Sequence, residues 1–367
     1  MRWTHTGFAQ QIRFGSGLVD EVAALVREAG GRRILLVTTE GRLASPDGER
    51  LVKVLGRELT STFAGVQSHV PAPAVQAAMQ QTRRDGVDAV VSFGGGSCAD
   101  LAKAVCYFTE REAGTPGATW LDRPALPHVA VPTTYSGAEL TPFFGMTDPS
   151  TRRKSGGGGT TIAPVAAVYD PELTLTTPAR VSAETGMNAL AHCVECAYSP
   201  SRTPEAEAVA LAGVRRIATA LPAVVDDPDD LTARTEMLAG AVLGGRALQN
   251  AAMGVHHGLA QLVGGRTGMA HGLANAIVLS HAMRFNAEAV PDELRRIGEA
   301  LGEPDDPARA VDHLVRRIGL PTQLSDCGFS DEDLDAVVRL SQSNPGVQMN
   351  PRPVSEDDAR AILEAAF

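Results

Sequence analysis

The amino-acid sequence predicts an α/β protein in two parts, a doubly wound parallel sheet followed by an all-helical domain. In the first half, short apolar runs typical of buried parallel strands alternate with helical patterns. In the second half the apolar spacing is helical nearly throughout. The length of 367 residues also exceeds the ~250–300 at which one hydrophobic core stops growing. Two domains are therefore expected.

Apolar runs in the first half mark the expected strands, at 32–40, 88–97, 128–134 and 165–171. Helical patterns at 72–86 and 97–108 separate them, and this alternation favours a parallel sheet with right-handed crossovers. The segment 150–161 contains four consecutive glycines and is expected to form a mobile loop or a flexible hairpin.

Amphipathic helices are expected to fill the second half. Each has an apolar stripe and ends at Gly, Pro or polar residues, and the clearest cover 205–221, 231–248, 292–302, 307–321 and 331–342. We place the boundary after residue 172. Residues 1–172 then form the α/β domain and residues 173–367 the helical domain.

The composition excludes several classes of protein. A net charge of −10 argues against nucleic-acid and anionic-membrane partners, because both require a basic face. We find no run close to the ~18 apolar residues that span a bilayer and no signal peptide, so a cytoplasmic location is expected. The five cysteines do not suggest a disulfide framework. Cys193 and Cys196 lie in a helical pattern, which favours helix packing over a redox or zinc role.

A glycine-rich turn follows the second predicted strand, in "VVSFGGGSCADLAKA". Gly94, Gly95, Gly96 and Ser97 lead into a helix, where backbone N–H groups and a helix N-terminus can hold a diphosphate. The pattern is neither G-x-G-x-x-G nor a P-loop, and a simple tight turn is the alternative.

Two threonines follow the third strand, in "PTTYSGAELT". Thr133 and Thr134 would lie at the carboxyl end of the sheet, where open α/β folds bind ligands. Their hydroxyls could hold a nicotinamide or its ribose. The alternative is that they cap a helix.

Three histidines lie in predicted helices, two of them in a region that glycines interrupt. Asn188 and His192 are four positions apart and would share one face of a helix. His257 and His271 are separated by glycines, so the second histidine is expected to begin a segment that folds back on the first. A single histidine is most often a core or surface residue, but His192, His257 and His271 together indicate a shared cleft.

Taken in order, these stretches resemble the iron-containing alcohol dehydrogenase family over nearly the whole chain. That family has a GGGSxxDxxK segment, a PTT segment, a D-A-x-x-H helix and two later histidines. They match Gly94 to Lys103 with Asp100, Pro132 to Glu139, Asn188 to His192, and His257 with His271. The resemblance implies the dehydroquinate synthase-like fold, with a Rossmann-like dinucleotide-binding domain, a helical catalytic domain and an active site in the cleft between them.

Within the family, the chain looks most like the maleylacetate reductase branch. The shared features are "PTTYSGAE", "TPFFGMTDPSTRRKSGG", asparagine at position 188, the pair His256-His257 and "NPRP" at 350–353. This branch is associated with NAD(P)H-dependent reduction of the carbon–carbon double bond of maleylacetate to 3-oxoadipate in aromatic breakdown, without a required metal. The chain departs from the branch at Gln261, where a histidine is usual, and at "AHGLANA" (270–276).

The donor set leaves the metal question open. Zinc is satisfied by three histidines and water, so His192, His257 and His271 could bind it. Exchange of a carboxylate for the Asn188 amide removes the one anionic ligand, on which hard iron-type sites depend. We predict that no metal is essential, with zinc or iron as the alternative.

The histidines and Asn188 can be given roles in such a reduction. Hydride addition to a conjugated alkene produces an enolate-like charge, which His257, His271 and His192 would stabilise and protonate while Asn188 orients the substrate. A carboxylate substrate needs cationic partners, for which the candidates are Lys154, Arg153 and Arg352. We assign Lys154 to the cofactor, and His256, Arg153 and Arg352 to the substrate.

The resemblance implies NADH or NADPH as the cofactor. Many family members place aspartate at the end of the first strand, whereas this chain has Thr39 with Arg42 nearby, which allows NADPH and does not exclude NADH. The predicted cofactor-binding set is Thr39, Gly94, Gly95, Gly96, Ser97, Asp100, Thr133, Thr134 and Lys154. The resemblance thus implies a homodimeric reductase of a small carboxylate. The alternatives are a metal-dependent alcohol dehydrogenase and a non-redox nucleotide-binding protein of a biosynthetic pathway.

Overall fold

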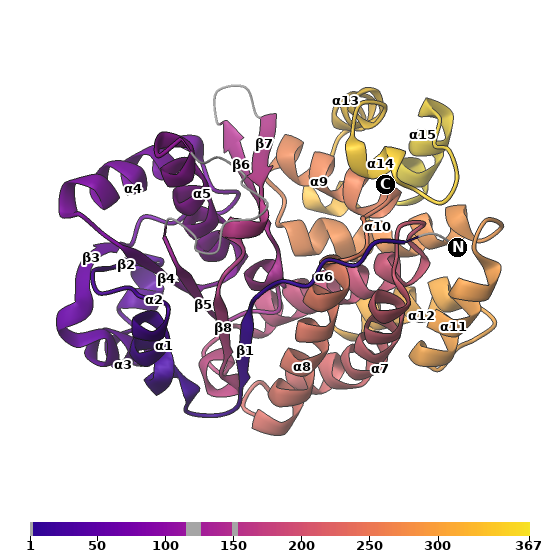
Figure 1. Ribbon diagram of the computed structural model, residues 1–367. Helices are drawn as coiled ribbons and strands as arrows, with labels where there is room; N and C mark the ends of the chain where they lie inside the picture. The colour runs from indigo at the N-terminus through magenta and orange to yellow at the C-terminus, as the bar shows by residue number, and fades with distance from the viewer. Residues whose placement is uncertain (1–2, 115–125, 149–152) are drawn as a thin grey trace. The chain divides into compact units, whose positions relative to one another are not determined.

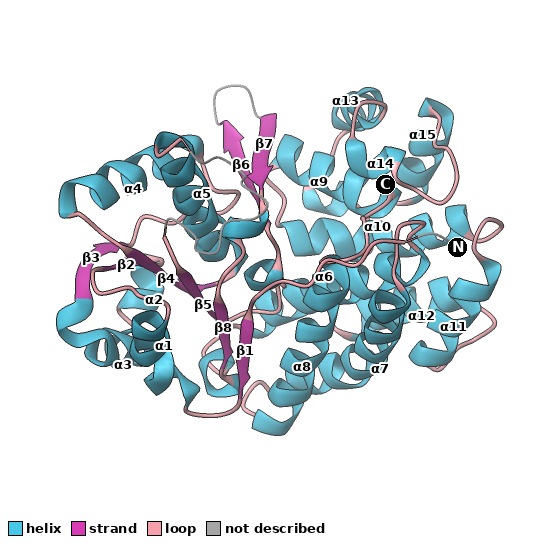
Figure 2. Ribbon diagram, in the orientation of Figure 1, coloured by secondary structure: helices cyan, strands magenta, loops and turns pink. Residues whose placement is uncertain are grey.

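The computed structural model describes residues 3–114, 126–148 and 153–367 (Figures 1 and 2). The chain divides into two compact units. One is an α/β unit, Gly7–Thr177, and the other is a helical unit made of Met1–Thr6 and Pro178–Phe367. The sequence placed the boundary after residue 172. In the structure it falls after Thr177, and residues 3–6 group with the helical unit.

The α/β unit is built on a six-stranded sheet in which every pair of neighbouring strands is parallel. Its order is β1-β8-β5-β4-β2-β3, with bounds β1 Gln11–Phe14, β2 Ile34–Val37, β3 Leu59–Phe63, β4 Ala89–Gly94, β5 His128–Pro132 and β8 Ala166–Tyr169. The predicted parallel sheet is confirmed. β1 and β3 escaped prediction because edge strands are partly exposed and polar, so they leave no continuous apolar run.

Helices cover both faces of this sheet. They are α1 Val22–Glu28, α2 Glu40–Leu43, α3 Pro46–Leu55, α4 Ala72–Asp85 and α5 Gly96–Glu112. Ile34 and Leu36 of β2 belong to a core with residues of α1 and α3, whereas Leu35 and Val37 belong to a core with residues of α4 and α5. Alternate side chains of one strand therefore enter opposite cores, and this is why β2 is apolar at every position.

A two-stranded antiparallel hairpin, β6 (Phe143–Asp148) with β7 (Arg153–Gly158), replaces the loop expected at 150–161. The hairpin alternative was therefore the correct one. The glycines of β7 are required by close packing: a Cβ on Gly156 would lie 2.3 Å from the carbonyl oxygen of Phe144, and one on Gly157 would lie 2.9 Å from the Tyr107 ring.

The helical unit contains ten α-helices in its described part: α6 Ala179–Tyr198, α7 Pro204–Asp226, α8 Leu231–Leu248, α9 Val255–Thr267, α10 His271–Asn286, α11 Pro291–Leu301, α12 Pro307–Arg317, α13 Asp331–Ser341, α14 Pro345–Gln348 and α15 Glu356–Ala365. Helix α6 is central, and every residue from Gly186 to Tyr198 is buried. A Cβ on Gly213 of α7 would lie 2.5 Å from the Cys193 sulfur. Cys193 thus packs between helices, and burial raises the pKa of its thiol to about 12.

Helix α7 is long and apolar enough to cross a membrane, which the sequence analysis did not anticipate. In the structure it packs against α6 and α8 (Figure 1), and Val214, Ile217 and Leu221 are wholly buried. A core helix of a helical unit meets the same criteria of length and composition. The cytoplasmic location stays a prediction.

Candidate functional site

The glycine-rich turn of the α/β unit lies where its backbone can approach a ligand closely. Gly94 ends β4 with a φ of 141°, which L-residues rarely adopt, and a Cβ there would lie 2.6 Å from the Cys98 sulfur. A Cβ on Gly96 would lie 3.0 Å from the side chain of Ser136. The turn therefore packs directly against the segment that follows β5. Glycine is required at position 94 by its backbone conformation, and position 96 leaves little room for a side chain.

Helix α5 begins at this turn and presents its N-terminus at the carboxyl edge of the sheet. Its N-cap residue, Gly95, supplies no side-chain hydrogen bond, so the first backbone N–H groups of a 17-residue helix are not capped by that residue. Because β2 lies between β3 and β4, the strand order reverses beside this edge, which is where open α/β sheets bind ligands. These features fit the phosphates of a dinucleotide.

The hydroxyls of Thr133 and Thr134 lie beside the glycine turn. The backbone N–H of Thr133 donates to the Gly94 carbonyl at 3.0 Å. Both hydroxyl oxygens are buried, and neither has a hydrogen-bond partner within the described part of the chain. Since a buried hydroxyl is normally satisfied, two such groups at one strand end indicate a place for a polar ligand.

Thr39 and Arg42 lie just beyond the end of β2. The Thr39 hydroxyl caps α2 by accepting from the backbone N–H of Arg42 at 3.2 Å. The Arg42 guanidinium donates to the hydroxyls of Thr176 and Thr177, each at 2.6 Å. Arg42 therefore holds the end of the α/β unit in place, and its described contacts do not mark it as a ligand of a nucleotide 2′-phosphate.

Asp100 and Lys103, the last residues of the GGGSxxDxxK pattern, form an ion pair of 2.9 Å. Lys103 is completely buried and also donates to the carbonyl oxygens of Ala138 and Phe143. The lysine thereby ties α5 to the turn after β5, while the cofactor role of Asp100 stays a prediction. Arg153 and Lys154 lie on β7, but their side chains are outside the described part of the structure.

The predicted histidine cluster forms in the helical unit. His192 of α6 and His257 of α9 stack with ring centres 4.7 Å apart and an interplanar angle of 19°. His271, the first residue of α10, lies 5.7 Å from His257 between ring centres. Gly268 ends α9 in the left-handed conformation, so α10 folds back as the glycines predicted. Burial lowers the pKa of His192 well below its usual value, and His257 adds to this effect.

Asn188 joins the cluster through an amide partner that sequence analysis missed. The side-chain Nδ2 of Asn275 donates to Oδ1 of Asn188 at 2.7 Å, and both side chains are buried. Asn275 stands four residues after His271 on α10. That spacing on one helix face was the available signal.

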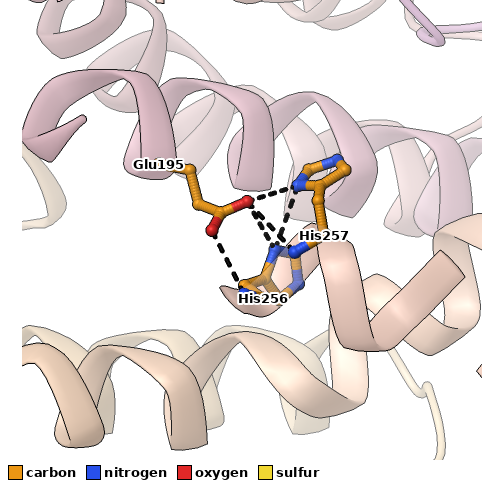
Figure 3. Close-up of side chains that lie close together, drawn as sticks. All are labelled: Glu195, His256 and His257. Atoms are coloured by element: carbon orange, nitrogen blue, oxygen red, sulfur yellow. Dashed lines mark hydrogen bonds and ion pairs between the residues drawn. The ribbon is translucent and has the colours of Figure 1, made fainter. Parts of the chain in front are cut away.

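Glu195 is the second residue that sequence analysis missed (Figure 3). Its side chain is completely buried, and its Oε2 accepts from Nδ1 of His257 at 2.7 Å. Burial would raise the pKa of this carboxyl, but its contacts with His256 and His257 outweigh burial and hold the pKa well below the usual range. Glu195 is therefore an anion. The i,i+3 spacing from His192 on α6 was the signal.

His256 supports the cluster from inside the protein. It is completely buried, its Nε2 lies 2.9 Å from the backbone oxygen of Asn275, and its Nδ1 lies 3.1 Å from Nδ1 of His257. Because both ring nitrogens make internal contacts, the structure argues against the substrate-binding role predicted for His256.

Arg352, predicted to bind the substrate, packs on Phe285 near the end of α10. Its guanidinium carbon lies 4.3 Å from the Phe285 ring centre, and Nη1 donates to the Phe285 carbonyl at 3.2 Å. None of its described contacts involves the histidine cluster. Gln261 is exposed on α9.

The α/β unit has a turn suited to a dinucleotide, and the helical unit has clustered histidines. Together these features define a class of dehydrogenases, and comparisons with known proteins identify the family. The model described as iron-containing alcohol dehydrogenase matches residues 9–171, and the model of the family's C-terminal region matches residues 182–367. The chain belongs to the iron-containing alcohol dehydrogenase family and is an oxidoreductase. Within this family it falls in the maleylacetate reductase branch.

Three similar proteins illustrate the relationship. Maleylacetate reductase of Burkholderia cepacia is 33% identical over 357 residues, which cover 97% of this chain and 95% of that protein. The crystal structure of maleylacetate reductase from Agrobacterium tumefaciens has a TM-score of 0.88 and 32% identity, covering 100% of this chain and 98% of that one. Sulfoacetaldehyde reductase from Bifidobacterium kashiwanohense, in complex with NAD+, has a TM-score of 0.90 and 25% identity, covering 100% and 99%.

The residues present do not fit the iron that gives the family its name. The matching positions offer three imidazoles and the neutral amide of Asn188, whose oxygen already accepts from Asn275. Hard cations prefer anionic oxygen ligands. Within the described residues, one set of His, Cys, Asp or Glu side chains has its possible ligand atoms within 4.8 Å of one another, and it consists of Glu195, His256 and His257. These three side chains are already hydrogen-bonded among themselves. We therefore derive no chemical step through a metal.

Proposed function

We propose that this oxidoreductase reduces the carbon–carbon double bond of a small conjugated carboxylate, with maleylacetate as the prototype and NADH or NADPH as the reductant. Two observations carry the proposal: the cluster of three imidazoles, and the neutral Asn188–Asn275 amide pair at the position of the family's acidic residue. Such a cluster can stabilise negative charge and transfer a proton without a metal. The similarity to maleylacetate reductases along the whole chain supports the same reaction class.

The α/β unit would hold the cofactor, which when bound supplies a hydride. Backbone N–H groups at Gly96 and Ser97 are suited to its phosphates, and the buried hydroxyls of Thr133 and Thr134 are suited to its polar groups. The complex of sulfoacetaldehyde reductase with NAD+ supports a nicotinamide cofactor. Thr39 carries no charge that would repel a 2′-phosphate, so both nucleotides are compatible with this strand end.

The helical unit would complete the reduction. A hydride added to the β-carbon of the alkene breaks the π bond and places negative charge on the conjugated oxygen, where N–H donors stabilise it. Transfer of a proton to the α-carbon then gives the saturated product. His192 has a strongly lowered pKa and stays neutral, so proton delivery falls to His257 or His271. Asn188 would orient the substrate.

The remaining expectations belong to this proposal. They are a homodimeric assembly, and contacts from Arg153 to the substrate and from Lys154 to the cofactor. The exposed Gln261 and the "AHGLANA" segment differ from the usual sequence of the branch, so we expect a comparison of maleylacetate with other enoates to identify the preferred substrate.

The test is an absorbance assay of chelator-treated protein with maleylacetate and each nucleotide. We expect turnover, and we expect His257→Ala to lower the rate at least ~100-fold, the scale of a lost proton donor. His313→Ala, which removes a largely exposed imidazole of α12, is the matched control and should leave the rate unchanged. Full activity of His257→Ala would remove this histidine from the mechanism.

The same experiment separates the alternatives. Activity that disappears with the chelator and returns with zinc or iron would favour a metal-dependent alcohol dehydrogenase. Tight nucleotide binding without oxidation against any enoate or carbonyl would favour the non-redox alternative.

A further inference from the structure

We propose that Glu195 is the positioning residue of His257: its carboxylate fixes the Nδ1–H tautomer and the ring orientation, so that Nε2 is the nitrogen that performs the chemistry. Only the chemical role of Nε2 in this inference rests on the proposed function. The tautomer itself follows from the contacts of Glu195 (Figure 3).

The tautomer follows from the direction of the hydrogen bonds. Both oxygens of Glu195 act as acceptors, because backbone N–H groups donate to each of them. The backbone N–H groups of Gly254 and His256 donate to Oε1 at 3.0 and 3.2 Å. The shortest contact, 2.7 Å, joins Oε2 to Nδ1 of His257. This nitrogen must therefore carry a hydrogen, and in the neutral ring the lone pair lies on Nε2.

The ring orientation follows from a double contact. Oε2 accepts from the backbone N–H of His257 at 3.1 Å as well as from its ring nitrogen, so one oxygen holds the main chain and the side chain of the same residue. The stacked His192 ring and the perpendicular His256 ring, 4.8 Å away, limit rotation further. A ring flip would turn a carbon toward the carboxylate and lose the 2.7 Å bond.

His256 contacts the same carboxylate less closely, with its Nδ1 3.4 Å from Oε2 of Glu195, and its other ring nitrogen is held elsewhere. The Nε2 of His256 donates to the backbone oxygen of Asn275, because a carbonyl can only accept. A carboxylate behind a working imidazole is a recurrent arrangement, since it sets the tautomer and favours the protonated ring that must form or act during the reaction.

Glu195 also caps the start of α9, so its loss can destabilise the protein. A test must therefore separate its effect on the His257 ring from its effect on folding stability. Glu195→Gln keeps the shape of the side chain but offers only one accepting atom in place of two. We expect that 15N spectra of histidine-labelled protein show His257 as the Nδ1–H tautomer in the wild type and no longer so in this variant. The His257 signals are assigned by their loss in His257→Ala.

Kinetics provide the second readout. We expect Glu195→Gln to lower kcat by at least ~100-fold, the scale of a mispositioned acid–base group, with the KM for the nucleotide unchanged. Glu195→Asp, which keeps the charge, should recover part of kcat and of the Nδ1–H signal. The control is Glu110→Gln, which alters a buried carboxyl of the α/β unit bonded to Thr161 at 2.6 Å. It should lower stability and leave the His257 signals unchanged.

Two results would overturn the inference. One is a wild-type spectrum in which His257 carries its hydrogen on Nε2, a measurement that requires no variant to fold. The other is a folded Glu195→Gln protein with the wild-type tautomer and wild-type kcat. If the wild type reduces no enoate, the proposed function fails, whereas the spectra still decide the role of Glu195.

Discussion

The side-chain amide of Asn275 donates a 2.7 Å hydrogen bond to Oδ1 of Asn188. This bond engages the oxygen that would otherwise face a cation, and it joins α10 to α6 within the histidine cluster. Position 188 is therefore a neutral acceptor held by a neutral donor. The negative charge of the cluster lies instead on Glu195, whose oxygens accept hydrogen bonds from His257 and from backbone N–H groups.

Restoring an acid at position 188 should create a cation site. Asn188→Asp places a carboxylate beside the imidazoles of His192, His257 and His271, which supplies the anionic ligand that the donor set lacks. We expect near-stoichiometric zinc after equilibrium dialysis of this variant and much less in the wild type. Asn188→Ala is the control, and equal zinc uptake by the two variants would show that the charge at this position does not govern binding.

A methyl group on Gly254 should disturb the cluster without changing any charge. The added Cβ would lie 2.9 Å from Oε1 of Glu195 and 2.9 Å from Oδ1 of Asn350. Gly254→Ala should therefore displace the carboxylate, lower kcat, and reduce the free energy of unfolding by ~1–3 kcal/mol, as overpacking does. Denaturant unfolding and the enoate assay measure the two effects. Gly145→Ala, where a Cβ meets nothing within 4 Å, is the control.

Removal of the Lys103 charge should destabilise the α/β unit. Lys103→Met leaves the partly buried Asp100 without its ion-pair partner and the carbonyl oxygens of Ala138 and Phe143 without this donor. We expect a loss of about 3 kcal/mol in the free energy of unfolding, measured by denaturant titration. The control is Lys53→Met on the exposed face of α3. Equal stability of the two variants would contradict a structural role for Lys103.

Buried His128 should make folding weaker in acid. Burial lowers the pKa of His128 to about 3, and the positive charge of Lys103 adds to the shift. The unfolded chain binds a proton near the ordinary pKa of about 6.5. The unfolded state therefore holds more protons between these values, so the stabilisation is complete above pH ~6.5 and is lost progressively as the pH falls toward 3.

Thermal unfolding at several pH values tests this expectation. His128→Gln, which can still bond Ser92, should show a shallower decline of stability from neutral pH to pH ~4.5 than the wild type, because one fewer proton is linked to unfolding. Parallel curves for the two proteins would exclude His128 as a contributor.

The parts of the fold that the sequence predicted are those with a one-dimensional signature. β2, β4, β5 and β8 are buried at every position and largely apolar, with Ser92 and His128 as polar exceptions, and the amphipathic helices show a 3.6-residue period. β1 and β3 lack such a signature at the sheet edges. The glycines of β7 resembled a flexible loop, because close backbone approach and flexibility leave the same pattern in a sequence.

The sequence by itself determined the order of the elements, the glycine turn after β4 and the membership of His192, His257 and His271 in one cluster, because local periodicity and rare residue types carry that information. Only the tertiary structure decided that Glu195 holds His257, that Asn275 engages Asn188, and that His256 and Arg352 turn to internal partners. These pairings join side chains as many as 87 residues apart. They depend on how each helix is rotated about its axis, which packing in three dimensions defines and the spacing of residues along the chain does not.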